Sequence, residues 1–186
     1  MHVFVSGDLA LDFVGTLKWR RSGEPDELLA GPAALDAWFV ESGLVSSPPG
    51  STSGDLREAV ALREAVYRAV GAALERKSTA AADAELINGL AAQRPVTPTL
   101  VAGGREASGT PPQALSSVAR AAIEVLTSDD ATPMKECGRP ECTRVYLDRS
   151  HGHRRTWCGM EECGNRVKAA AYRQRRKERE APPASH

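Results

Sequence analysis

Apolar residues in the first part of the chain recur mostly at intervals of three and four, the spacing of helices that bury one face. The clearest repeat lies between residues 55 and 74, where Asp55 is predicted to cap the start and Glu64 to pair with Arg68. Its apolar positions are Leu56, Ala59, Val60, Leu62, Val66, Tyr67, Val70 and Leu74. The stretch is therefore predicted to be an amphipathic helix.

The rest of the first 130 residues predicts further helices and little β-structure. Helices are expected at about 9–17, from 32 to a stop at Gly43, and at 80–92 and 113–126. A loop is expected at 46–54, a short strand at 97–101 and a turn or loop at 103–112. Leu35, Trp38 and Phe39 are expected to be buried. The predicted fold is mainly α with a minor α+β character: a helical N-terminal domain with one small β element, a small four-cysteine module and a basic C-terminal helix.

Composition supports a helical core and a cytoplasmic setting. The 186 residues are 41% hydrophobic but only 5% aromatic, so the core must be built mostly from Leu, Val and Ala. No apolar run is long enough to span a membrane, and no secretory signal is visible. A cytoplasmic protein without membrane contact is expected, in which cysteines stay reduced.

Charge divides the chain into an acidic body and a basic end. Thirteen Lys or Arg and six Asp or Glu lie between Lys135 and Arg179, a balance of +7. Because the whole chain has a net charge of zero, the remaining residues carry −7. This division indicates an end that seeks a polyanion, although uneven surface charge without a partner is the alternative.

The four cysteines of the chain form two pairs, Cys137 with Cys142 and Cys158 with Cys163. Four residues separate the members of each pair, and fifteen residues separate the pairs. Zinc takes four soft ligands at tetrahedral corners, and two tight turns aim two thiolates each at one point. The spacing therefore predicts one structural zinc ion held by all four cysteines, with no open position for catalysis.

Other chemistry remains open for the same residues: two disulfides, four free thiols or a redox-sensing thiol cluster. Disulfides conflict with the expected cytoplasmic setting. His151 and His153 could replace a ligand, but four cysteines saturate the ion, so we interpret both as surface or phosphate-facing residues.

Basic residues surround the cysteine cluster and continue beyond it. A helix is predicted after Gly164, with Arg166, Arg173 and Lys177 on one side. The residues expected to pack back on the zinc module are Val167, Ala171 and Tyr172. Such a helix has the shape and charge to enter the major groove of duplex DNA. The candidate DNA-contacting residues are Arg149, Ser150, Arg154, Arg155, Asn165, Arg166, Lys168, Arg173, Arg175, Arg176 and Lys177. A solvated basic helix without a partner is the alternative.

These residues also resemble the CGNR zinc-finger family. The matching segments are the two Cys-x4-Cys pairs, Tyr146-Leu147-Asp148-Arg149-Ser150, Arg154-Arg155-x-Trp157-Cys158, and the namesake Cys163-Gly164-Asn165-Arg166 followed by a basic run. The N-terminal part resembles the ABATE domain that precedes this finger in bacterial proteins, on the stretches 9–16, 62–65 and 87–88. Gly15 departs from that pattern, in which asparagine is expected. The resemblance implies a transcription regulator, in some cases stress-induced, that binds double-stranded DNA.

A regulator needs an input, and Asp12, Thr16 and Trp19 are candidate ligand-binding residues, with Arg20 and Arg21 beside them. Local capping and core packing are the alternative roles, and no ligand is named by the sequence. A small-molecule effector and a homodimer remain candidate partners of the N-terminal domain.

The predicted organisation is a regulatory domain at 1–130, a zinc finger with its basic helix at 131–179 and a disordered tail at 180–186. The predicted function is DNA-binding transcription regulation. An RNA-binding or protein-interaction zinc module and a thiol-based redox sensor are the alternatives. An enzyme is not expected, because G-x-S-x-G, H-E-x-x-H, glycine-rich phosphate loops and the zinc-deaminase pattern are all missing from the sequence.

Overall fold

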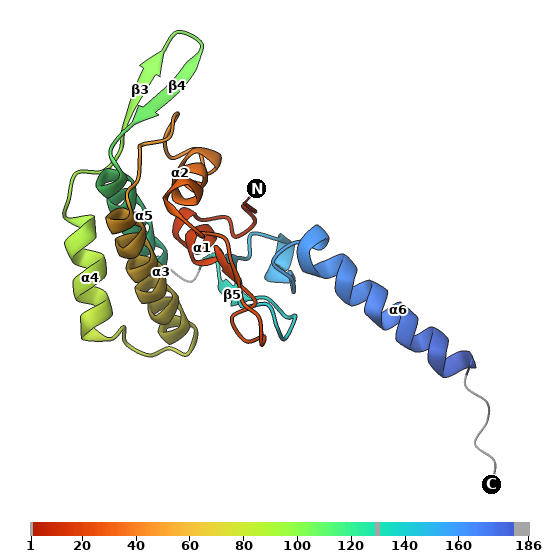
Figure 1. Ribbon diagram of the computed structural model, residues 1–186. Helices are drawn as coiled ribbons and strands as arrows, with labels where there is room; N and C mark the ends of the chain where they lie inside the picture. The colour runs from red at the N-terminus through yellow and green to blue at the C-terminus, as the bar shows by residue number, and fades with distance from the viewer. Residues whose placement is uncertain (1, 129–130, 181–186) are drawn as a thin grey trace.

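The computed structural model describes residues 2–128 and 131–180, with only the backbone described for Ala171 and residues 177–180. A helical N-terminal body is followed by a small cysteine-containing module and by a helix that projects away from both (Figure 1). The body helices are α1 (Leu9–Val14), α2 (Pro32–Glu41), α3 (Ser53–Leu74), α4 (Ala81–Ala91) and α5 (Pro111–Thr127). The prediction of a mainly α fold is confirmed.

The core of the body lies where α3, α4 and α5 pack side by side, α1 packs on α3 and α5, and α2 packs on α3. The predicted burial of Leu35, Trp38 and Phe39 is confirmed, since each is at most 1% exposed. The ring centroid of Trp38 lies 4.8 Å from that of Phe13 and 5.9 Å from that of Phe39. Phe13, Trp38 and Phe39 therefore cluster and add ring contacts to a core made mostly of aliphatic side chains.

The start of α3 differs from the prediction by three residues. Thr52, not Asp55, is the N-cap: its Oγ1 accepts from the amide of Asp55, whose carboxylate accepts from the amide of Thr52 at 2.8 Å. Two cap-forming residues three apart make a reciprocal capping box, and the first of them becomes the cap.

The predicted Glu64–Arg68 pair is also wrong, because both side chains have other partners. Glu64 binds Arg20 and Arg63, and Arg68 binds Asp83.

The β-structure consists of three antiparallel pairs of short strands in the described residues. These are β1 (Leu17–Lys18) with β2 (Asp26–Glu27), β3 (Thr97–Val101) with β4 (Gly104–Ser108), and β5 (Met134–Glu136) with β6 (Val145–Leu147). The predicted strand at 97–101 is confirmed, but 104–108 is a strand rather than a loop. Gly103, with a φ of +99°, makes the tight turn that lets the second strand fold back.

The N-terminal body and the zinc module share a core and a backbone seam. Val145 and Leu147 of β6 belong to the main hydrophobic core. Residues 2–6, here called the N-terminal strap, run along the module: the carbonyl of Ser6 accepts from the amide of Leu147 at 2.8 Å, and that of Val3 accepts from Arg144 at 3.0 Å. The strap therefore fastens the first residues of the chain to its last third.

The C-terminal helix α6 (Asn165–Glu180) continues from one π-helical turn, Met160–Gly164. Glu180, which we predicted to begin the tail, is the last helical residue, and the rest of the predicted tail lies outside the described residues. Within the part of the chain that the structure describes, no helix is long and apolar enough to cross a membrane.

Candidate zinc site and nucleic-acid interface

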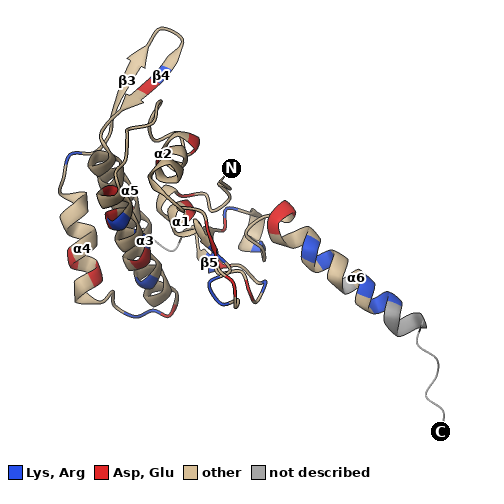
Figure 2. Ribbon diagram, viewed as in Figure 1, with Lys and Arg blue, Asp and Glu red and all other residues tan. Residues whose placement is uncertain are grey.

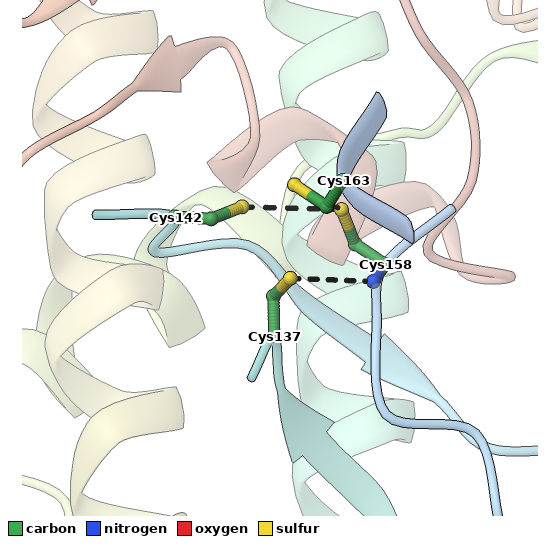
Figure 3. A group of neighbouring side chains, drawn as sticks. All are labelled: Cys137, Cys142, Cys158 and Cys163. Carbon is green, nitrogen blue, oxygen red and sulfur yellow. Dashed lines mark hydrogen bonds between the residues drawn. The ribbon is translucent and has the colours of Figure 1, made fainter. Parts of the chain in front are cut away.

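The four cysteines meet at one point in the structure (Figure 3). Their sulfurs lie within 4.8 Å of one another, and all four side chains are buried. The β5–β6 pair places Cys137, whose amide donates to the carbonyl of Arg144 at 2.9 Å. The amide of Cys142 closes a turn on the carbonyl of Arg139 at 2.9 Å, and the π-helical turn brings in Cys163.

The spacing of the sulfurs fits a zinc ion. Zinc–sulfur bonds of about 2.3 Å at tetrahedral corners put neighbouring sulfurs about 3.8 Å apart. The sulfur of Cys158 lies 3.9 Å from that of Cys142 and 3.7 Å from that of Cys163. A disulfide would need about 2.05 Å, and all four cysteines are free. The four residues form a closed structural zinc site, as predicted, and the disulfide alternative is wrong.

Thiol chemistry explains why this cluster favours a cation. The pKa of Cys137 falls to about 2, because its sulfur takes part in hydrogen bonds with Cys142 and Cys158. The pKa of Cys142 rises to about 12, mainly through its interaction with Cys137. The pKa of Cys158 also rises, because both of these sulfurs oppose a further negative charge. A divalent ion removes this conflict, because it stabilises all four as thiolates.

A buried carboxylate holds the loop between the two cysteine pairs. Asp148 is fully buried and accepts hydrogen bonds from Lys135 Nζ at 2.7 Å, Ser150 Oγ at 2.6 Å and the amide of Arg155 at 3.1 Å. Burial raises the pKa of Asp148, but the bonds from Lys135 and Ser150 outweigh burial and hold that pKa well below its usual range. The family motif contains this residue, but its sequence context alone did not reveal its role.

Most of the candidate DNA-contacting residues are on the surface. The exposed members are Arg149, Arg154, Asn165, Arg166, Lys168, Arg173, Arg175 and Arg176. Ser150 is half-buried and binds Asp148. The side chain of Lys177 lies outside the described residues. The structure therefore gives two exposed basic segments, the 149–154 loop and α6, and Figure 2 shows the basic residues spread along that helix.

Arg155 is the exception, and we remove it from the DNA-contacting set. Its guanidinium donates to the carbonyl of Trp157 at 2.8 Å, to that of Val5 at 2.8 Å and to that of Cys158. It also lies 4.2 Å from the ring centre of Tyr146, whose hydroxyl donates to the Arg155 carbonyl at 2.8 Å. A charged side chain that donates to three carbonyls of its own chain has a structural role. Counting charges in the sequence cannot distinguish such an arginine from an exposed one.

A groove of about 630 Å³ runs between the first cysteine pair and α6. It is lined by Arg139, Pro140, Glu141, Asn165, Arg166, Val167, Ala169, Ala170 and Arg173. The expectation that Arg166 and Arg173 lie on one side of the helix is confirmed, since both line this groove. Tyr172, expected to pack on the module, is instead 64% exposed, because α6 points away from it. Of the three arginines that line this groove, only Arg139 was not a candidate from sequence.

The candidate ligand-binding residues of the N-terminal body have internal partners. Asp12 accepts from the amides of Val5 at 3.0 Å and Ser6 at 2.9 Å, while burial raises its pKa despite these bonds. Thr16 donates to the carbonyl of Phe13 at 2.7 Å. Because α1 ends at Val14, Asp12 and Thr16 do not share a helix face. These contacts favour the local structural role that was the alternative.

Trp19, Arg20 and Arg21 also turn toward the protein. Trp19 packs against the cysteine cluster, Arg20 pairs with Glu64, and Arg21 pairs with Glu136 of β5. The segment between β1 and β2 thus connects α3 to the zinc module. An effector pocket formed by these side chains stays an untested prediction.

A helical body joined to a closed four-cysteine centre and a basic helix defines a protein of the zinc-finger class. Comparison with family models identifies both parts. The chain belongs to the ABATE family, described as "Putative stress-induced transcription regulator", whose model matches residues 7–129. The CGNR zinc-finger model matches residues 134–176. No curated protein matches the chain. The two family resemblances are therefore confirmed, and they support a regulator with a zinc module.

Proposed function

We propose that this chain is a transcription regulator that binds double-stranded DNA through the zinc module and α6. The observation that carries the proposal is the placement of α6. Its contacts with other elements are concentrated on the π-helical turn, and its basic residues from Arg166 to Arg176 are exposed. A helix that exposes a run of basic residues gains little from burial of that run in its own fold, and it suits a polyanionic partner.

The groove beside α6 supports a docking mode. Arg166 and Arg173 lie along one side of it with Ala169 and Ala170 between them, so the helix backbone can approach a partner closely. The first residues of a recognition helix usually contact base edges. Asn165 and Arg166 are in that position, and their side chains suit adenine and guanine. The other basic residues would contact phosphates and set the register.

The N-terminal domain would supply regulation, as a sensor or as a dimerisation unit. We also propose that the protein is not an enzyme, because a closed thiolate site has no open position for a substrate. A small-molecule effector and a homodimer remain proposals for this domain.

Fluorescence anisotropy with a labelled duplex, at several salt concentrations, tests DNA binding. We expect an R166Q/R173Q double variant to bind more weakly, and to lower the salt slope by about 0.9 because Arg173 is the one phosphate contact that it removes. R94Q, at an exposed arginine of the N-terminal body, is the matched control and should bind normally. Unchanged binding by the double variant contradicts the proposed interface, and a preference for single-stranded RNA contradicts duplex recognition.

A further inference from the structure

The β3–β4 hairpin projects from the helical body, away from α6 (Figure 1). Most of its side chains face solvent, and only Ala107 of its two strands is buried. Leu100 is 92% exposed, which makes it the most exposed large apolar residue in the part of the chain that the structure describes. An isolated pair of strands is marginally stable in water and normally gains a further strand or a helix that covers it. The hairpin therefore lacks part of its packing in a single copy of the chain.

The two outer edges of the hairpin differ in how they are covered. Along β4, the amide of Ser46 donates to the carbonyl of Ala107 at 2.9 Å, and Ser46 Oγ accepts from the amide of Ala107 at 2.9 Å. Arg105 also donates to the carbonyl of Gly43 at 3.0 Å. These contacts fasten β4 to the segment after α2. The backbone at the outer edge of β3 has no hydrogen-bond partner among the described residues.

The register of the hairpin shows which backbone groups of β3 form this open edge. Ala107 uses its amide and carbonyl on Ser46, on the side away from β3, so the groups of its cross-strand partner Pro98 also point outward. Because these groups alternate along a strand, the N–H and C=O of Leu100 lie at the outer edge as well. Pro98 has no N–H and blunts one end of the edge. In β3, which is described along its whole length, Leu100 is thus the position that offers both a donor and an acceptor outward.

Charge does not protect this edge. Lysine is a usual means by which proteins keep exposed edge strands from pairing. Residues 97–104 contain no charged side chain, although 26% of the residues of the chain are charged. Two copies of β3 can therefore approach each other without repulsion between their side chains.

We propose that the outer edge of β3 is the surface through which two copies of this chain form a dimer. The strands pair antiparallel about a two-fold axis at Leu100, and each Leu100 amide donates to the Leu100 carbonyl of the other copy. The two leucine side chains then cover each other on one face of a four-stranded sheet. Because the edge is short, the dimer is weak and concentration-dependent. The proposal assigns a surface to the homodimer considered above and does not rest on DNA binding.

Sedimentation velocity of the zinc-loaded full-length protein, at concentrations up to about 1 mM, tests the association. We expect a reversible monomer–dimer equilibrium in this range. L100K should raise the dimer dissociation constant at least about 10-fold, because it removes the leucine contact and places two like charges opposite each other. Q93K adds the same charge at an exposed residue outside the hairpin and should associate as the unmodified protein does. A monomer at every concentration overturns the proposal, as does normal association of L100K.

Hydrogen exchange followed by NMR locates the contact. The Leu100 amide should become protected only as the protein concentration rises, whereas the amides of Thr99 and Val101, which face β4, should be protected at every concentration. Exchange at Leu100 that does not depend on concentration, in a protein that does dimerise, overturns the placement of the interface.

Cross-linking tests the register. In L100C the two cysteine Cα atoms would lie about 5.5 Å apart across the axis, a distance that a disulfide spans, so mild oxidation should give a covalent dimer. R94C, at an exposed residue outside the hairpin, is the matched control and should cross-link far less. Equal cross-linking of the two variants contradicts pairing at Leu100.

Discussion

Arg63 offers the sharpest test of how the N-terminal body is held together. Its side chain is 2% exposed, and it donates from Nη1 and Nη2 to the two carboxylate oxygens of Glu27, each at 2.7 Å. Its Nε donates to Glu64 at 2.9 Å, and its Nη1 also reaches Thr16 at 3.3 Å. The side chain thus ties α3 to β2 and to the segment after α1.

The cost of replacing Arg63 by methionine follows from burial. Removing one partner of a fully buried ion pair costs about 3–5 kcal/mol, because the other charge is stranded. Here the side chains left behind are partly exposed, Glu27 at 38% and Glu64 at 29%, and Glu64 keeps its bond to Arg20. Water can therefore solvate part of the freed charge, and we expect a loss of about 2–3 kcal/mol.

Arg21 is the matched control, since it also pairs with a glutamate through two nitrogens. Its side chain is 53% exposed and that of Glu136 is 32% exposed, so Arg21→Met should cost at most about 1 kcal/mol. Urea unfolding of the zinc-saturated protein, followed by far-UV circular dichroism, measures both variants. The reasoning is refuted if Arg63→Met loses no more stability than Arg21→Met.

Three further outcomes follow from single contacts. Burial raises the pKa of Glu27, but its bonds to Arg63 outweigh burial and lower that pKa below the usual 4.5. The contribution of this ion pair to the free energy of unfolding is therefore complete above that pH and is lost in acid, as a pH series of urea midpoints should show. Asp12→Ala leaves two strap amides without their acceptor and should cost about 1–3 kcal/mol, with faster hydrogen exchange in residues 5–6. In Gly138→Ala the new Cβ would lie 2.9 Å from Thr156 Cγ2 and 3.1 Å from the carbonyl oxygen of Thr156, so zinc affinity should fall. Gly23→Ala is the control: its new Cβ meets nothing within 4 Å, and the variant should bind zinc normally.

The helices of the body were predictable because their apolar spacing and breakers are local signals. Periodicity predicted the long helix except for its first turn, and Gly43 predicted the end of α2 to within two residues. Ion pairing was not predictable in the same way. Glu64 and Arg68 are one turn apart, yet Glu64 pairs with Arg20 and Arg68 pairs with Asp83, each from another element. A buried or bidentate tertiary ion pair is stronger than an exposed ion pair along a helix.

The metal ligands were predictable because chelation demands particular residues at short spacing, and no other cysteine competes. The roles of the surrounding arginines were not. Arg155 and Arg166 look alike in sequence, but one binds three carbonyls of the fold and the other lines an open groove. One of the three carbonyls belongs to Val5 in the strap, which comes from the opposite end of the chain.

Removal of zinc should distinguish the part of the structure that is held by the metal from the part that is held by the hydrophobic core. The cysteine turns contain few apolar side chains, and metal binding in such sites supplies about 10–16 kcal/mol at neutral pH. β6 is different, because Val145 and Leu147 lie in the main core and the amide of Leu147 binds the strap. A strong chelator should therefore abolish hydrogen-exchange protection in residues 137–142 and 156–164, while β6 and the helices of the body stay protected.

Hydrogen exchange with mass spectrometry, before and after chelation and again after zinc is restored, measures this order of loss. Loss of protection in α3 and α5 at the same chelator concentration would show instead that body and finger unfold as one unit. Retention of protection in the cysteine turns would show that zinc contributes nothing to their folding. The expected result is that the cysteine turns lose protection while the body keeps it. It would mean that zinc fixes the direction of α6 relative to the body, because the π-helical turn at the start of α6 contains the ligand Cys163. Metal loss would then disconnect the basic helix without unfolding the N-terminal body.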